Sequence, residues 1–191
     1  MAHATPAGAP SVGKHAAARR AVVLVDTVVD CIGRAAAWLT LAIALLMAVN
    51  VLLRYAFSIG SVWSQELEWH LLSPLVLLGM TYALQKGDHV RVDVFYARYT
   101  ARAQAAVDLL AAALALAFAF LVIRYSMAYV GQSYAIHEVS SDPGGLTHRW
   151  LLKALIPAGF GLFAVQALAQ GVDALLRLSG ADPAHTRSGD A

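Results

Sequence analysis

The sequence contains a single cysteine, Cys31, and few charged residues. One cysteine cannot form an intrachain disulfide, and it cannot build a thiolate metal site by itself. Only 14% of the 191 residues are charged, whereas soluble domains have about a quarter. The hydrophobic fraction of 59% therefore indicates a membrane protein. The formal net charge of +2 is too small to argue for nucleic-acid binding.

The sequence also lacks the short motifs of common enzyme and metal-site classes. It has no phosphate-binding glycine loop, no dinucleotide-binding glycine pattern, no HExxH and no paired Cys/His zinc ligands. We therefore expect no catalytic residue, no metal and no cofactor. One alternative stays open, an electron-transfer membrane anchor with haem between His70 and His137 or His148, since such a haem needs two axial ligands at one depth.

Four apolar segments are long enough to cross a membrane, at residues 35–53, 67–84, 103–123 and 151–169. Each has close to the roughly 20 residues with which a helix crosses about 30 Å of hydrocarbon. Pro74 and Pro157 fall inside two of them, and membrane helices tolerate proline better than soluble helices do. The expected fold is an all-α membrane protein, with four transmembrane helices in one domain over residues 21–176.

The segments outside these spans differ in character. Residues 1–20 are rich in Ala, Pro, Gly and His and predict a disordered tail, and residues 177–191 form a second tail. Residues 86–102 mix valine and aromatic side chains with Asp and Arg. This mixture predicts an interfacial amphipathic segment between the second and third spans. Residues 142–145 read Asp-Pro-Gly-Gly, a strong turn signal.

Lysine and arginine are distributed unequally between the two sides of the membrane. Ten lie in the N-terminal part, in the link between the second and third spans and at the C-terminus, and four lie on the other side. Because cytoplasmic loops carry the excess of positive charge, both termini are expected in the cytoplasm. The links 54–66 and 134–150 would then face the opposite side of the lipid bilayer.

Polar side chains stand on both sides of the link between the first two spans. Arg54 ends the first span, and Glu66 precedes the second. Ionised groups so close to hydrocarbon are costly, so they usually have a partner. We expect Arg54 to pair with Glu66, Ser64 to cap the second helix, and Asn50 to hydrogen-bond another helix. A capped helix start with solvated carboxylates is the alternative.

Asp108 lies inside the third predicted span, about a turn and a half from its start. An acidic residue at the centre of a bilayer costs roughly 2.5–3.5 kcal/mol, and less near the interface. We therefore expect Asp108 at the interface, where Arg102 or Gln104 would shield it. A contact with a partner protein is the alternative.

Five short motifs follow one another along residues 35–176. They are Asn50-x-x-x-Arg54-Tyr55-x-Phe57, Trp63-x-x-Glu66-Leu67, Gly87-x-His89-Val90-x-Val92-Asp93, His137-Glu138-Val139-Ser140, and Ile156-Pro157-x-Gly159-Phe160 with Gln166 and Leu168. In this order and spacing they resemble the small permease subunit of tripartite ATP-independent periplasmic (TRAP) transporters, the DctQ-like family.

The resemblance implies a four-helix subunit of the bacterial inner membrane that braces a large permease subunit. A periplasmic solute-binding protein delivers the substrate, usually an organic acid, for sodium-coupled uptake. The family offers no catalytic residue. Residues expected in structural or subunit contacts are Asn50, Arg54, Glu66, His89, Asp93 and Glu138. Among them, Asp93 is expected beside a basic neighbour, and Glu138 at the periplasmic face.

Overall fold

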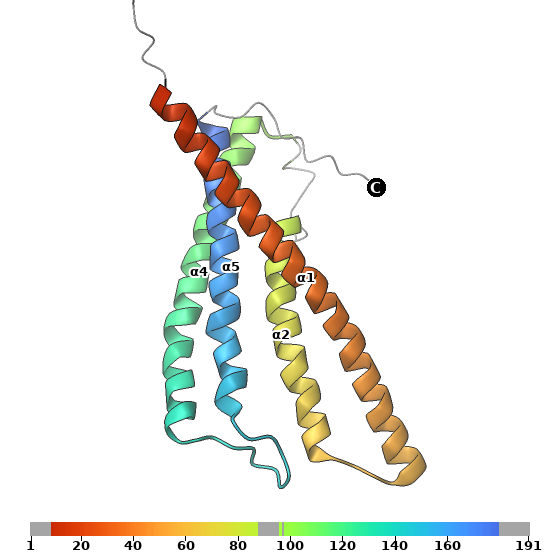
Figure 1. The fold of residues 1–191 in the computed structure, drawn as a ribbon. Helices are drawn as coiled ribbons and strands as arrows, with labels where there is room; N and C mark the ends of the chain where they lie inside the picture. Colours follow the sequence, from red (N-terminus) through yellow and green to blue (C-terminus); the bar gives the residue numbers. More distant parts are fainter. Residues whose placement is uncertain (1–8, 88–95, 97, 180–191) are drawn as a thin grey trace, which may run out of the picture.

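The computed structural model describes residues 9–87, 96 and 98–179. The helices are α1 (Ala9–Phe57), α2 (Val62–Lys86), α4 (Ala101–Ala135) and α5 (Arg149–Leu178), shown in Figure 1. Each is long and apolar enough to cross a membrane, and the described part of the chain contains no strand. The predicted all-α membrane fold with four spanning helices is therefore confirmed.

The helices form two hairpins, α1 with α2 and α4 with α5 (Figure 1). The α4 helix packs mainly against α5, whereas α5 also contacts α2 and α1. We call the end with the connections 58–61 and 136–148 the loop end, and the opposite end the terminal end. The two hairpins spread apart toward the loop end, and α1 crosses α5 near the terminal end (Figure 1).

Buried residues recur at intervals of seven along two of the helices. In α1 they are Val29, Ala36 and Ile43, and in α4 they are Ala105, Ala112, Ala119, Ser126 and Ser133. A seven-residue repeat keeps one line of side chains against the neighbour when helices wrap around each other with a left-handed twist. Because every buried position of α4 is small, its backbone can approach α5 closely, which is how helices associate in lipid.

Two glycines allow helices to touch where a side chain would not fit. A Cβ atom on Gly33 of α1 would overlap the ring of Tyr82 in α2. A Cβ on Gly159 of α5 would lie 2.7 Å from the Cβ of Leu77 in α2. Gly161, two residues further along α5, has open space around it. The α2 helix is therefore in contact with the backbones of both α1 and α5.

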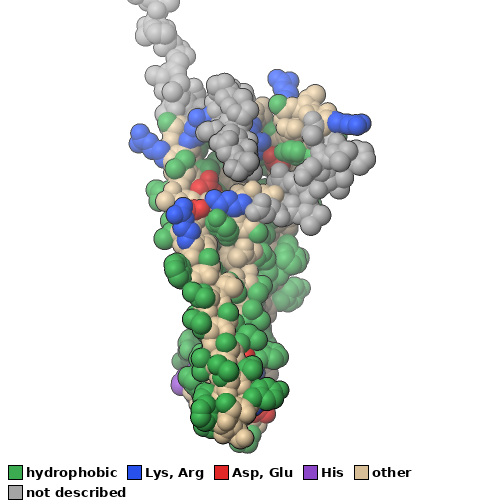
Figure 2. All heavy atoms as spheres, turned by 90° about the vertical axis from the view of Figure 1, so that its right-hand side faces the viewer, with side chains coloured by type: hydrophobic (Ala, Val, Ile, Leu, Met, Phe, Trp, Pro, Cys, Tyr) green, Lys and Arg blue, Asp and Glu red, His purple; other side chains and the backbone are tan. Residues whose placement is uncertain are grey.

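The surface of the helices is suited to lipid. Large apolar side chains such as Leu45, Leu72 and Phe118 are about half exposed or more. Figure 2 shows hydrophobic side chains along the length of one face, with lysine and arginine gathered toward the terminal end. Pro74 and Pro157 lie inside α2 and α5, as expected of membrane helices.

The helices extend beyond the predicted spans. The α1 helix has 49 residues, or about 73 Å at 1.5 Å per residue, far more than the bilayer thickness. Residues 9–20 are helical, although a disordered tail was expected over 1–20, and residues 1–8 lie outside the described residues. An apolar run marks only the lipid-embedded part of a helix, because a helix continues until a cap or turn ends it.

The caps of α2 illustrate this. Its N-cap is Ser61, whose hydroxyl accepts the N–H of Ser64, so the N-cap lies three residues before its expected position at Ser64. Its C-cap is Gly87 with φ 74°, a left-handed conformation that suits glycine. Most of the predicted interfacial segment at 86–102 and residues 180–191 lie outside the described part of the chain.

Candidate functional site

Glu66 of α2 binds the loop of the other hairpin. Its carboxylate Oε1 accepts a hydrogen bond from the Ser140 hydroxyl, and Oε2 accepts the backbone N–H of Leu146 at 2.5 Å. A Cβ on Gly145 would lie 2.5 Å from the Cβ of Ser140 and 2.8 Å from Glu66 Oε2, so glycine lets these two residues approach the loop closely. We call these four residues the Glu66 clasp. The clasp joins the two hairpins at the end where their helices spread apart.

The loop that Glu66 holds has its own hydrogen bonds. The N–H of Ser140 donates to Leu146 O at 3.1 Å, and the N–H of Gly145 donates to Asp142 O at 3.0 Å. Gly144 has φ 82°, as a turn with proline at its second and glycine at its third position requires. The turn predicted at 142–145 is therefore confirmed, and it presents a folded surface to Glu66.

Glu138 fastens the same loop to its own hairpin. It forms an ion pair with the ammonium of Lys153 in α5, which also lies 3.9 Å from the centre of the Tyr129 ring in α4. The hydrogen bond from Lys153, together with the positive charges of Lys153 and Arg149, lowers the pKa of Glu138 below its ordinary value of 4.5. Glu138 is thus held as a carboxylate at neutral pH.

The lowered pKa of Glu138 predicts how its contribution to stability depends on pH. A carboxyl group whose pKa is lower in the folded than in the unfolded chain stabilises the fold above its ordinary pKa of 4.5. This stabilisation is lost as the pH falls through the folded value. We expect Glu138→Gln to be less stable than the wild type at pH 7. The difference should shrink in thermal unfolding scans below pH 4.5. A difference that stays constant down to pH 3 would contradict this assignment.

Asn50 connects α1 to α2 inside the first hairpin. Its amide Nδ2 donates to Glu68 Oε1 at 2.5 Å, and its Oδ1 accepts from the Ser64 hydroxyl at 2.5 Å. The expected hydrogen bond from Asn50 to another helix is present. Glu68 was not among the predicted contact residues, although its spacing of four from Ser64 places both on one face of α2.

The expected pairing of Arg54 with Glu66 is not formed. Glu66 binds Ser140 and Leu146, and Arg54 is exposed at the end of α1. The reason is helical phase, because residues two apart on a helix point about 200° away from each other. Glu68 therefore faces α1, and Glu66 faces the loop of the second hairpin. Arg54 stays a proposed subunit contact.

A second polar cluster joins three helices toward the terminal end. Gln166 of α5, only 1% exposed, donates from Nε2 to Asp26 Oδ1 at 2.9 Å. Gln85 of α2 donates to the backbone carbonyl of Asp26 at 2.5 Å, and Gln170 donates to Leu84 O at 2.6 Å. We call this set the glutamine cluster. It binds α1 to both α2 and α5 at a site that sequence reasoning missed.

Ion pairs lie beside the glutamine cluster. Asp30 bonds both Arg34 and Lys86 at 2.9 Å, and the latter residue is the last of α2. Asp108 of α4 bonds Arg177 of α5 at 2.8 Å and the Tyr96 hydroxyl at 2.9 Å. Arg177 and Tyr96 thus bond Asp108, where shielding by Arg102 or Gln104 was expected. Gln104 contributes through the carbonyl of Tyr96, to which it donates at 3.1 Å.

Other predicted site residues are not brought together. His89 and Asp93 lie outside the described residues, so the expected contact of Asp93 stays a prediction. The ring nitrogen Nδ1 of His70 lies 2.8 Å from Glu66 O within α2. In the described part of the chain, no group of three His, Cys, Asp or Glu side chains could hold a metal ion.

A comparison with protein families agrees with this description. Residues 43–177 match the family model described as tripartite ATP-independent periplasmic transporters, DctQ component. The match covers the second part of α1, all of α2 and α4, and α5 up to Arg177, so it includes the Glu66 clasp and most of the glutamine cluster. A comparison with curated proteins found no match.

Proposed function

The chain belongs to the DctQ family, the small membrane component of TRAP transporters, and we propose that it braces the large permease subunit of such a transporter. The family is a transporter component and not an enzyme family. In TRAP systems it works with a large permease and with a periplasmic binding protein. These two proteins and the lipid bilayer are therefore the proposed partners of this chain.

The observation that carries the bracing role is that polar contacts join the two hairpins at both ends. The Glu66 clasp lies at the loop end, and the glutamine cluster lies toward the terminal end. Alternating access in secondary transporters is largely a rigid-body motion of one part against another. The stationary part must resist bending, and two cross-links separated along the helices oppose both splaying and sliding of the hairpins.

The finer features of the proposal come from the sequence. We place the chain in the bacterial inner membrane with both termini cytoplasmic, because ten of the lysines and arginines then lie on the cytoplasmic side. The loop end, with the Glu66 clasp, then faces the periplasm, from which the binding protein delivers its cargo. The transported substrate is proposed to be an organic acid, taken up with sodium.

Uptake by reconstituted components tests this function. The chain is co-purified with the large subunit of its own system, reconstituted into liposomes and supplied with the loaded binding protein and a panel of carboxylic acids. Sodium-dependent uptake is expected only when both membrane subunits are present. The matched controls are liposomes with the large subunit alone and with this chain alone.

Two outcomes would contradict the proposal. Uptake by this chain alone would make it an independent carrier, and uptake by the large subunit alone at the full rate would remove its bracing role. A haem Soret band in the purified chain would instead support the electron-transfer alternative. The absorption spectrum is recorded on the same sample as the uptake assay.

A further inference from the structure

The outer face of α4 borders the bundle on one side. The α4 helix packs mainly against α5, which lies between α4 and α2 (Figure 1). On the face opposite the buried line of α4, exposed residues recur at alternating intervals of four and three. We call them the outer seam, and they are Ala117, Leu121, Arg124, Ala128, Gly131 and Ala135. Such spacing is typical of a helix face that packs along a second helix.

Small residues make up most of the outer seam. All its members except Leu121 and Arg124 are alanine or glycine. A Cβ atom on Gly131 would enter open space, whereas a Cβ on Gly159 would overlap a side chain of another helix. Glycine weakens a helix, and small residues allow a second helix to approach closely in lipid. The outer seam therefore has the shape of a packing face, although no described element of this chain packs on it.

Arg124 places a charge on this seam within the membrane. The ring contact of Tyr134 with Trp150 at 5.3 Å marks the aromatic level at the loop end, and the ion pair of Asp108 with Arg177 marks the terminal end. Along α4 these two levels are about 39 Å apart, close to the thickness of a whole bilayer. Arg124 lies about 15 Å from the first level and about 24 Å from the second, and therefore inside the hydrocarbon.

The guanidinium of Arg124 has no partner within the described part of the chain. Arg124 is two residues from the buried Ser126, so its side chain points about 200° away from the α5 contact. Side chains of a helix lean toward its N-terminus, which for α4 is the end further from the nearer headgroups. Arginines reach headgroups from near helix ends, whereas α4 continues past Arg124 to Ala135. An ionised group at this depth is costly without a partner.

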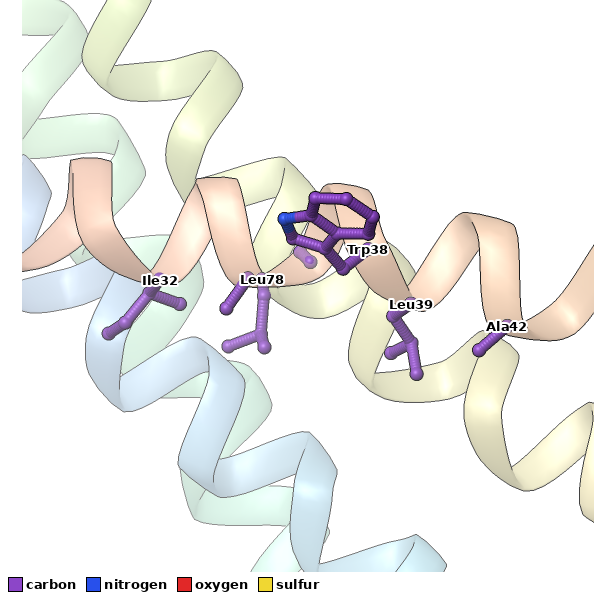
Figure 3. A pocket seen from close by; sticks show the side chains of 7 residues that line it. Ile32, Trp38, Leu39, Ala42 and Leu78 are labelled. Atoms are coloured by element: carbon purple, nitrogen blue, oxygen red, sulfur yellow. The ribbon is translucent and has the colours of Figure 1, made fainter.

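A second outward surface of the bundle carries no such charge. An apolar groove of about 530 Å³ runs along α1 beside Leu78 of α2. Figure 3 shows Leu78 near Ile32 and Leu39. All seven lining residues of the groove are apolar, so it suits a lipid tail and an apolar helix equally. The outer seam is more selective, because its arginine needs a partner that is negatively charged.

We propose that the large permease subunit docks on the outer seam, and that one of its helices presents an aspartate or glutamate carboxylate to Arg124. A carboxylate can bind the guanidinium through two parallel hydrogen bonds. A second copy of this chain docked by the same face would place two arginines against each other. A phospholipid holds its phosphate at the headgroup level, so that only its apolar tails lie beside Arg124. The identity of the partner rests on the proposed function.

Photo-cross-linking in the assembled complex tests the docking face. The photoreactive residue p-benzoylphenylalanine replaces Ala128 of the outer seam, and the full-length chain is reconstituted in liposomes with the large subunit of its own system. Irradiation is expected to link this chain to the large subunit. The matched control carries the same residue at Ala111, an exposed alanine of α4 outside the outer seam, and is expected to give no link.

Substitutions at Arg124 test the charge. Arg124→Leu is expected to leave the isolated chain at least as stable as the wild type in thermal unfolding, because no described partner is lost. The same variant should bind the large subunit about tenfold more weakly or worse, as when one member of a buried ion pair is removed. Energy transfer between the labelled subunits, in liposomes of decreasing protein content, measures this affinity. Arg124→Lys keeps the charge and is expected to lose less.

Three results would overturn the inference. The first is cross-linking to the large subunit from position 111 and not from position 128. The second is a link from position 128 to lipid or to a second copy of this chain in the assembled complex. The third is wild-type affinity of Arg124→Leu for the large subunit. In each case the proposed function still holds if uptake requires both membrane subunits, and it fails separately if uptake does not require this chain.

Discussion

A Gly159→Ala chain is expected to be less stable than a Gly161→Ala chain by about 1–3 kcal/mol, the usual cost of overpacking a tight contact. The new methyl group would lie 2.7 Å from the Cβ of Leu77, whereas at Gly161 it would enter open space. Both substitutions gain the same helix propensity, about 1 kcal/mol. The difference between their free energies of unfolding therefore reports on the α2–α5 contact. Equilibrium unfolding in mixed detergent micelles measures both free energies.

A double substitution isolates the steric cause. Leu77→Ala removes the side chain that the new methyl group would strike, so Gly159→Ala should cost less in the Leu77→Ala background than in the wild type. In this double-mutant cycle, the two substitutions together are expected to destabilise the chain less than the sum of their separate effects. If both glycine variants were equally stable, or if Leu77→Ala gave no rescue, the close contact would not limit the packing of these helices.

The Glu66→Gln chain is expected to lose the link between the hairpins at the loop end. A glutamine offers one acceptor oxygen where Glu66 offers two, and its amide group would face the donors Ser140 or Leu146. Hydrogen bonds to a carboxylate are also stronger than those to a neutral amide. With Cys31 replaced by serine, spin labels at positions 60 and 142 should show a broader distance distribution, and the thermal midpoint should fall by several degrees.

Arg54→Ala is the matched control, because Arg54 is a charged residue at the same end of the molecule. It is exposed, and the structure gives Glu66 other partners. Its label distances and thermal midpoint are expected to match those of the wild type. A variant at Arg54 that broadened the distribution as much as Glu66→Gln would mean that this arginine, and not the loop, restrains Glu66.

The fold followed from local composition. Apolar runs near 20 residues predicted all four spanning helices, and Asp-Pro-Gly-Gly at 142–145 predicted a turn that the structure contains. These features depend on the solvent that surrounds a segment or on the conformation of neighbouring residues. The limits of the helices were predicted less well. Ser61 caps the N-terminus of α2 and Gly87 caps its C-terminus, and both lie outside the apolar run from which the span was predicted.

The partners of the site residues were harder to predict. Asp26 and Gln166 are 140 residues apart, and Asp108 and Arg177 are 69 apart. Nothing local specifies such pairs, because they depend on which helix packs against which. To predict whether Glu66 or Glu68 faces α1, one must know the rotational orientation of α2 about its own axis. That rotation is set by Gly159, Gly33 and the side chains that enter the space they leave.

The position of α5 at the end of the chain has a consequence for biosynthesis. The carboxylates of Asp26, Asp108 and Glu138 each bond a residue of α5, and α4 packs mainly against this helix. While α1, α2 and α4 leave the ribosome, these carboxylates lack their partners in α5, and a charge at or near the membrane is costly without its full set of partners. Insertion of α5 therefore completes the structure in one late step, and a chain that ends before residue 149 has no route to the native packing.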